Sequence, residues 1–379
     1  MHSLKKEFLE HLKYGQTELA TLRALGEHRG KQALYFKQSP EALKSLQQVA
    51  IVESSESSNR LEGIEVPHKR IEELVLGNTK PKSRSEQEVA GYRDVLALIH
   101  ESAAEMKFTP NLILQIHQLV YGYLAQPGGK WKNTDNEIIE RKATGEVRVR
   151  FKPTRAFQTP QAVADLTKNY HEACDHGTTD PLILVPAAIL DFLCIHPFSD
   201  GNGRVARLLT LMLLYHFDYQ VGRYISLERV FEESKEEYYR TLEASSQGWH
   251  KGKHDLMPWL NYFWIALHSA YGEFEKRVGS VKSGRGSKTD QIRKAVHRQL
   301  GAFAISDIER ECPWISRDMV RLILREMRDE GFIQAHGKGR GAKWKVISKD
   351  ESNIQNSSKK TVSRGQSERA FTRKPRHKK

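Results

Sequence analysis

The chain has 379 residues, a formal net charge of +13 and 39% hydrophobic residues, enough for two or three domains with cores of their own. Its longest apolar run, residues 181–195, is shorter than the roughly 20 residues of a membrane span, so we expect no membrane partner. The three cysteines are isolated, which argues against disulfides or a zinc site and favours a reducing, cytoplasmic location. The charged, helix-like residues 1–12 do not have the pattern of a signal peptide.

Residues 1–105 are predicted to form a helical region. It contains the string Ser58-Asn59-Arg60-Leu61-Glu62-Gly63, in which a serine and a glutamate are four residues apart. Side chains at that spacing lie on the same side of a helix. Taken alone, the string is also compatible with an ordinary exposed helical turn.

Helical spacing of apolar residues predicts a helix over residues 111–124. It carries His117, whose position beside the apolar face favours a structural role. Further on, residues 137–139 and 147–151 alternate apolar and charged side chains on either side of a glycine-containing turn at residues 142–146. This pattern predicts a β-hairpin.

The most informative stretch runs from residue 196 to residue 207 and reads HPFSDGNGRVAR. Apolar residues precede and follow it, so we expect a loop between two buried helices. Gly201 and Gly203 allow a sharp turn and a close backbone approach, and the next helix would present its free amides to an anion. Arg204 and Arg207 are three residues apart and are predicted to point the same way. Together these residues suit the phosphates of a nucleoside triphosphate.

This stretch resembles, at all eight fixed positions, the signature of the Fic (filamentation induced by cyclic AMP) family, His-x-Phe-x-Asp/Glu-Gly-Asn-Gly-Arg-x-x-Arg. The resemblance implies an all-α Fic (Fido) fold with a small hairpin called the flap, in a core over residues 106–275. It also implies transfer of AMP from ATP to a hydroxyl side chain of a target protein, with release of pyrophosphate.

The chemistry of that reaction assigns roles to the residues of the signature. His196 would be the general base, because imidazole titrates near neutral pH. Asp200 would hold Mg²⁺ between the α- and β-phosphates. The remaining residues would bind ATP: the loop amides and Arg204 on the phosphates, Arg207 on the γ-phosphate, and a tyrosine pair beside the adenine. These residues are Gly201, Asn202, Gly203, Arg204, Arg207, Tyr238 and Tyr239.

The string at residues 58–63 resembles the inhibitory motif of the same family, Ser/Thr-x-x-x-Glu-Gly/Asn. The resemblance implies that Ser58, Glu62 and Gly63 lie on a helix over the ATP pocket and that Glu62 pairs with Arg207. An arginine held by a carboxylate cannot also seat a γ-phosphate. Alternatively, the same glutamate orients a water that removes AMP from a modified target.

The hairpin corresponds to the flap, and the resemblance implies that it pairs with the target segment through its backbone. Its residues would be Val147, Arg148, Val149 and Arg150. The sequence departs from the family at three places: Lys132 replaces a common arginine, Ile189 a common histidine and Ser246 a common asparagine. Because the region around Ser246 borders the adenine in the family, a nucleotide donor other than ATP stays an alternative.

Charge separates the end of the chain from the rest. Residues 281–379 carry a net charge of +14, so residues 1–280 are nearly neutral. A linker is expected at 276–288, followed by a winged helix-turn-helix domain at 289–348 and a basic, disordered tail at 349–379. In this domain, Ser306 and Ser316 would cap the second and third helices.

The winged helix predicts contact with DNA through residues 289–348 and the basic tail, with a dimer or protein-interaction module as the alternative. The contact residues would be Arg317, Arg321, Lys338 and Arg340.

Two hypotheses follow for the whole chain. The first is an autoinhibited protein adenylyltransferase that uses ATP and Mg²⁺; the second is a DNA-binding regulator whose Fic domain senses a nucleotide. Self-modification in the tail is a further expectation, and a homodimer stays open. The candidate acceptors in the tail are Ser357, Ser358, Thr361 and Ser363.

Overall fold

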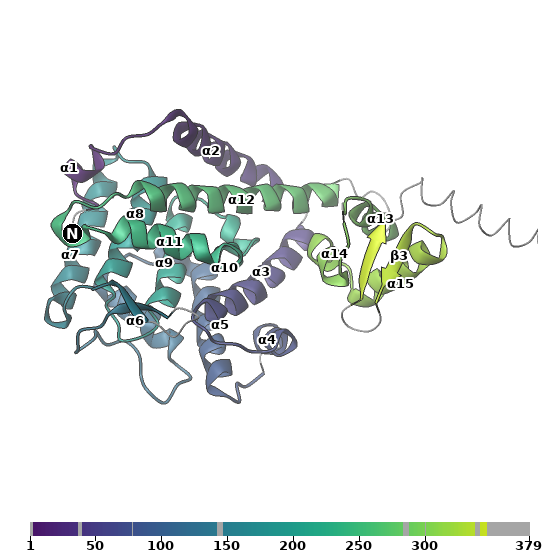
Figure 1. Cartoon of the computed structure of the whole chain (residues 1–379), viewed down its shortest axis with the longest axis horizontal. Helices are drawn as coiled ribbons and strands as arrows, with labels where there is room; N and C mark the ends of the chain where they lie inside the picture. Colours follow the sequence, from purple (N-terminus) through teal and green to yellow (C-terminus); the bar gives the residue numbers. More distant parts are fainter. Residues whose placement is uncertain are drawn as a thin grey trace, which may run out of the picture. The chain divides into compact units, whose positions relative to one another are not determined.

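The computed structural model describes residues 3–36, 40–77, 79–141, 147–282, 288–299, 301–337 and 342–346. The chain divides into two compact units, residues 1–278 and 279–379 (Figure 1). The described part of the first unit is helical apart from one β-hairpin, as expected for a Fic fold. In the described part of the chain, none of the helices is both long and apolar enough to cross a bilayer.

The first unit contains α-helices, short 3-10 helices and the two strands of the hairpin. In chain order its elements are α1 (Lys6–Leu9), α2 (Gln16–Phe36), α3 (Pro40–Leu61), α4 (His68–Val75), α5 (Arg84–Ser102), η1 (Ala103–Glu105), α6 (Pro110–Val120), β1 (Ile138–Arg141), β2 (Val147–Phe151), η2 (Ala156–Gln158), α7 (Thr159–His176), α8 (Pro181–Ile195), α9 (Asn202–His216), η3 (Val221–Arg223), α10 (Leu227–Glu233), α11 (Lys235–Ser246), η4 (Trp249–Lys251) and α12 (Met257–Lys282).

Helices α8 and α9 form the centre of this unit, and nearly every residue of both is buried. The carboxylate of Asp180 accepts a hydrogen bond from the amide of Leu182 at 2.8 Å and so caps α8, while Pro181 occupies the first helical position. Because both helices are buried on nearly all sides, neighbouring helices cover them. Helix α8 packs against α7, α9 and α11, and α9 packs against α5 and α6.

The N-terminal helices belong to the same core as the rest of the unit. Leu25 of α2, Leu46 of α3 and Tyr92 of α5 are fully buried in one cluster with the residues of α8 and α9. The expected regions 1–105 and 106–275 are therefore parts of one compact unit. Helix α12 continues to Lys282, into the expected linker 276–288; residues 283–287 lie outside the described part of the chain.

The predicted hairpin is present as the antiparallel strands β1 and β2. Ile139 pairs with Val149, and Arg141 pairs with Val147, so these side chains share one face of the hairpin. The connecting residues 142–146 lie outside the described residues.

The second unit contains three helices followed by an antiparallel hairpin: α13 (Lys288–His297), α14 (Ile305–Glu311), α15 (Arg317–Asp329), β3 (Ile333–His336) and β4 (Lys343–Val346). Ser316 caps α15, as predicted, by accepting from the amide of Met319. The predicted cap Ser306 is wrong: α14 begins at Ile305, and the Asp307 carboxylate accepts from the amide of Ala304 at 2.7 Å. The expected wing-tip residues, Lys338 and Arg340, and the tail 349–379 with its acceptors lie outside the described residues.

Candidate active site

The loop between α8 and α9 holds the predicted base. His196 follows the last residue of α8, and its backbone is left-handed, with φ 51° and ψ 62°. Its Nδ1 lies 3.3 Å from the carbonyl oxygen of Leu193. Because a carbonyl oxygen can only accept, Nδ1 carries the proton and Nε2 keeps the lone pair.

The surroundings of His196 keep its ring neutral. Burial lowers the pKa of His196 to about 4, and the ammonium of Lys132 acts in the same direction. The Leu193 carbonyl and the carboxylates of Glu62 and Asp200 oppose this shift. The imidazole is therefore in the form that a general base requires at pH 7.

The first turn of α9 offers backbone amides that have no partner within the helix. Gly201, just before the helix, has φ 80°, a conformation that glycine adopts without strain. A Cβ atom on Gly203 would lie only 2.1 Å from Oε1 of Glu62, so the close approach of this carboxylate requires glycine. The Glu62 carboxylate thus occupies the end of a helix that attracts anions.

Asn202 closes the loop rather than facing a ligand. Its Oδ1 accepts from the amide of Phe198 at 2.9 Å, and its Nδ2 donates to the carbonyl of Phe198 at 2.8 Å. The residue is 2% exposed. It is predicted from the sequence to bind ATP, but in this structure its side-chain amide is engaged within the loop, whose shape it fixes.

Asp200 is the one predicted metal ligand, and its side chain is 66% exposed. Oδ1 accepts from the amide of Gly201 at 2.7 Å, and Oδ2 lies 3.9 Å from Arg204. The described residues contain no group of three or more histidine, cysteine or acidic side chains that could form a protein-only metal cage. An exposed carboxylate beside the free amides of a helix start is compatible with Mg²⁺, which binds through one or two carboxylates and substrate phosphates.

Arg207 is held by the predicted inhibitory residues. Its Nη2 donates to Oε1 of Glu62 at 2.7 Å and to the carbonyl of Ser58 at 2.8 Å, and its Nε donates to Oγ of Ser58 at 2.8 Å. The guanidinium is 2% exposed, whereas the Glu62 side chain is 27% exposed. Gly63, with φ 78°, follows directly and turns the chain away from α3.

Arg204 does not point the same way as Arg207. Its Nη1 donates to Glu88 of α5 at 2.6 Å, and its Nη2 donates to the hydroxyl of Tyr121 at 3.2 Å. Its side chain is 1% exposed. Residues three apart are only about 60° apart around a helix, but the partners of the two side chains separate them: Arg204 reaches Glu88 of α5, and Arg207 reaches Ser58 of α3. In this structure Arg204 ties α9 to α5.

A cavity of about 200 Å³ lies beside His196, smaller than the roughly 300–1,000 Å³ typical of ligand sites. Glu62, Gly203 and Arg207 form its polar end. Its other walls come from the hairpin, α8 and α11; they are Ile138, Arg150, Phe151, Leu190, Leu193, Cys194, Tyr238, Tyr239, Leu242, Glu243 and Ser246. Both predicted tyrosines therefore line the cavity.

The Fic/DOC family model matches residues 107–214, which include the whole run from His196 to Arg207. These residues therefore form a Fic domain. The match begins one residue after the expected start of the core at 106.

Two curated relatives match part of this chain at modest identity. "Protein adenylyltransferase fic-1" of Caenorhabditis elegans is 28% identical over 175 residues, 45% of this chain and 29% of its own length. A Fido domain-containing protein of Dictyostelium discoideum is 26% identical over 107 residues, 27% of this chain and 71% of its own length. The match to the fic-1 protein thus spans less than a third of that relative.

Solved structures share the fold. A Fic family protein from Desulfovibrio desulfuricans G20 is 19% identical, with a TM-score of 0.56, and the alignment covers 89% of this chain and 98% of that one. Residues 134–508 of Fic-1 from C. elegans align with a TM-score of 0.55 at 20% identity, covering 69% of this chain and 72% of that one.

The arginines of the predicted flap hold it against α11. Arg148 and Arg150 donate to the two carboxylate oxygens of Glu243 on α11, at 2.6 and 3.0 Å. Val147 and Val149 lie on the opposite face and are 53% and 42% exposed. The apolar face of the flap is therefore open, and its basic face is engaged.

Tyr238 and Tyr239 make different contacts. Tyr238 is 3% exposed, and its ring stacks on Phe231 with centroids 5.3 Å apart. The hydroxyl of Tyr239 donates to the carbonyl of Leu61 at 3.2 Å, beside Glu62. Tyr239 thus connects the cavity wall to the end of α3.

Sequence reasoning missed the segment that supports the signature loop. Lys132, identified only as a departure from the family, is 3% exposed and donates to the carbonyl of Ile195. His117 accepts from the amide of Gly129 at 2.8 Å and contacts the carbonyl of Asp200 at 3.1 Å. The sequence shows this lysine and this histidine on either side of Gly128-Gly129, but only the folded structure shows that both contact the loop between α8 and α9.

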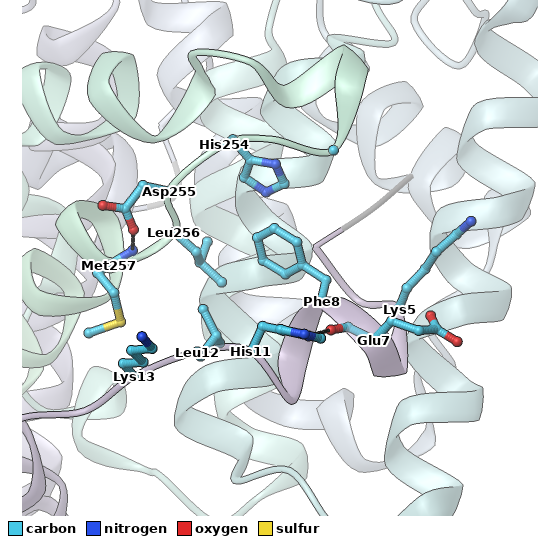
Figure 2. A pocket seen from close by; sticks show the side chains of 11 residues that line it. Lys5, Glu7, Phe8, His11, Leu12, Lys13, His254, Asp255, Leu256 and Met257 are labelled. Atoms are coloured by element: carbon cyan, nitrogen blue, oxygen red, sulfur yellow. Dashed lines mark hydrogen bonds between the residues drawn. The ribbon is translucent and has the colours of Figure 1, made fainter.

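A larger cavity, of about 680 Å³, lies elsewhere in the first unit (Figure 2). It is formed by the N-terminal segment and the residues around His254, on whose ring Phe8 stacks with centroids 4.4 Å apart. Its charged side chains, Lys5, Glu7, Lys13 and Asp255, have mixed signs. None of the signature residues lines it, so the smaller cavity is the candidate active site.

Proposed function

We propose that this chain is a protein adenylyltransferase that uses ATP and is inhibited by its own Glu62. The observation that carries the proposal is the pairing of Arg207 with Glu62 and Ser58, next to a neutral His196. His196, Gly203 at the start of α9 and the Glu62 carboxylate line one cavity, which supports a base, an anion site and a group that blocks it. The name of the fic-1 relative supports the same activity.

The reaction follows from the residues around the cavity. Nε2 of His196 takes the proton of a target hydroxyl, whose oxygen attacks the α-phosphorus of ATP. The bond from the α-phosphorus to the bridging oxygen breaks, pyrophosphate leaves, and a phosphodiester joins AMP to the target. The amides at the start of α9 stabilise the charge on the phosphate oxygens. Mg²⁺ held by Asp200 would neutralise charge on the α- and β-phosphates.

Inhibition follows from competition for Arg207. While its guanidinium is engaged with Glu62 and Ser58, three of its five N–H donors are occupied and its charge is already paired with a carboxylate, which prevents it from seating a γ-phosphate. The carboxylate also lies against Gly203, where a phosphate oxygen would meet the helix amides. Release of Glu62 would free the arginine and the anion site together.

The test compares ATP labelled at the α-phosphate with ATP labelled at the γ-phosphate, using the Glu62→Gly variant and Mg²⁺. We expect covalent label only from the α-labelled nucleotide, and a mass increase of one adenylyl group on the modified peptide. Label from the γ-phosphate would identify a kinase. ATP binding without either label would favour the nucleotide-sensing alternative.

For the second unit we propose a winged helix that binds duplex DNA. Three helices followed by an antiparallel hairpin support the fold, and α15 exposes Arg317, Arg321 and Arg325. Acidic neighbours partner two of these arginines: Glu309 lies 3.4 Å from Arg317, and Asp318 lies 3.3 Å from Arg321. We expect the affinity for duplex DNA to fall steeply with salt, and to fall further in the Arg317→Ala/Arg321→Ala variant. Affinity that is unchanged in this variant would exclude α15 as the contact.

A further inference from the structure

We infer that Lys132 is a positioning residue that holds His196 in its working conformation. The inference rests on the proposed function, because it concerns the base of that reaction. Lys132 lies in the loop between α6 and β1, more than 60 residues from the signature in sequence. It contacts the backbone on both sides of His196.

The backbone of His196 needs external support. It is one of two described non-glycine residues with positive φ. A left-handed conformation is unfavourable for a residue that carries a side chain, so it persists only where the surroundings fix it. On the N-terminal side, the amide of His196 donates to Phe192 at 2.9 Å and completes the last turn of α8.

Lys132 supplies the remaining support. Its Nζ donates to the carbonyl of Ile195 at 3.1 Å, and its backbone amide donates to the carbonyl of Pro197 at 2.9 Å. One residue therefore holds the carbonyls immediately before and after His196. A second donation from Nζ to Asn136 at 2.8 Å fixes the lysine, and Asn136 in turn donates to the carbonyl of Phe198 at 3.2 Å.

The charge of Lys132 adds to this geometric role. Both acceptors of its ammonium are neutral oxygens, and burial lowers the pKa of Lys132 to about 8. The group is still mostly protonated at pH 7, although burying it is costly. The charged groups that act on His196 are this ammonium and the carboxylates of Glu62 and Asp200. Of these three groups only the ammonium of Lys132 is positively charged, and it favours the neutral form of the His196 imidazole.

The test uses the Glu62→Gly background, in which transfer is measurable, with Lys132→Met to remove the ammonium at similar length. Lys132→Arg restores a charged donor, and the exposed neighbour Lys130→Met is the matched control. We expect Lys132→Met to lower kcat about 10–100-fold, as for a displaced catalytic group, while the Kd for ATP and the Tm stay close to the parent. Lys132→Arg should recover most of the rate, and Lys130→Met should change nothing.

A second readout does not depend on transfer. The His196 ring signal in the NMR spectrum, assigned with a His196→Ala variant, reports the pKa of that ring. We expect Lys132→Met to raise this pKa and Lys130→Met to leave it unchanged. An unaltered His196 pKa, or a Lys132→Met loss of rate matched by equal losses of ATP binding and Tm, would overturn the inference. Failure of the Glu62→Gly parent to transfer AMP would refute the proposed function instead, and the NMR result would still decide the role of Lys132.

Discussion

The hydroxyl of Ser58 provides a graded test of inhibition, because it accepts from a buried guanidinium. In Ser58→Ala, Nε of Arg207 loses its acceptor at 2.8 Å, and the guanidinium is only 2% exposed. A hydrogen bond to a charged group contributes about 1.5–3 kcal/mol. The inhibited arrangement should lose that amount relative to one in which Arg207 binds phosphate. Because 1.4 kcal/mol corresponds to a factor of ten, transfer should rise about 10–100-fold.

The assay measures initial rates of incorporation from α-labelled ATP, with Glu62→Gly as the upper reference. The matched control is Ser55→Ala on the same helix, since Ser55 is also fully buried but its Oγ has no partner in the described part of the chain. We expect Ser55→Ala to stay within about twofold of the wild type, since it removes no hydrogen bond. If Ser58→Ala is no faster than Ser55→Ala, the hydrogen bond to Arg207 does not hold the inhibited state.

Three further predictions concern stability and the flap. Burial lowers the pKa of His100 to about 3. Below pH 6.5 the unfolded chain therefore binds a proton at this histidine that the folded chain does not bind. Through this group, the free energy of unfolding of the wild type should fall by about 2 kcal/mol between pH 8 and pH 5. His100→Phe, which keeps the ring contact with Tyr215, should remove that loss in urea titrations; an unchanged pH dependence would contradict the assignment. Arg204→Met should lower the free energy of unfolding by up to about 3–5 kcal/mol because it leaves the buried Glu88 carboxylate with only the exposed Arg84, and Glu88→Gln should restore part of it. Intact stability with lost ATP binding would instead make Arg204 a phosphate ligand. Glu243→Gln weakens the ion pairs of Glu243 with Arg148 and Arg150 of the flap. It should lower kcat/KM for a protein acceptor about threefold to tenfold and leave ATP binding unchanged. An effect on ATP binding alone would refute the flap assignment.

The sequence was sufficient to predict the parts of the site that depend on local pattern. Two apolar helices flanking a glycine-containing loop specify their own geometry, and the family resemblance led to the pairing of Glu62 with Arg207. The hairpin followed from alternation and a turn. The serine cap of α15 followed from a polar residue before an amphipathic run.

What could not be predicted depends on contacts between distant segments. The direction of Arg204 is set by Glu88, which is 116 residues away in the sequence. Lys132 appeared only as a departure from a family pattern, and its burial beside Ile195 is a property of the folded chain. The merging of the N-terminal helices with the core likewise required knowledge of which apolar faces meet.

The most direct test of the central claim measures AMP transfer from α-labelled ATP by the wild type, Glu62→Gly, and Glu62→Gly with His196→Ala. Glu65→Gly, three residues along the chain, is the matched control. We predict that Glu62→Gly incorporates label at least about tenfold faster than the wild type and Glu65→Gly, and that adding His196→Ala abolishes transfer while ATP still binds. Equal rates in Glu62→Gly and the wild type, or undiminished transfer without His196, would contradict the account.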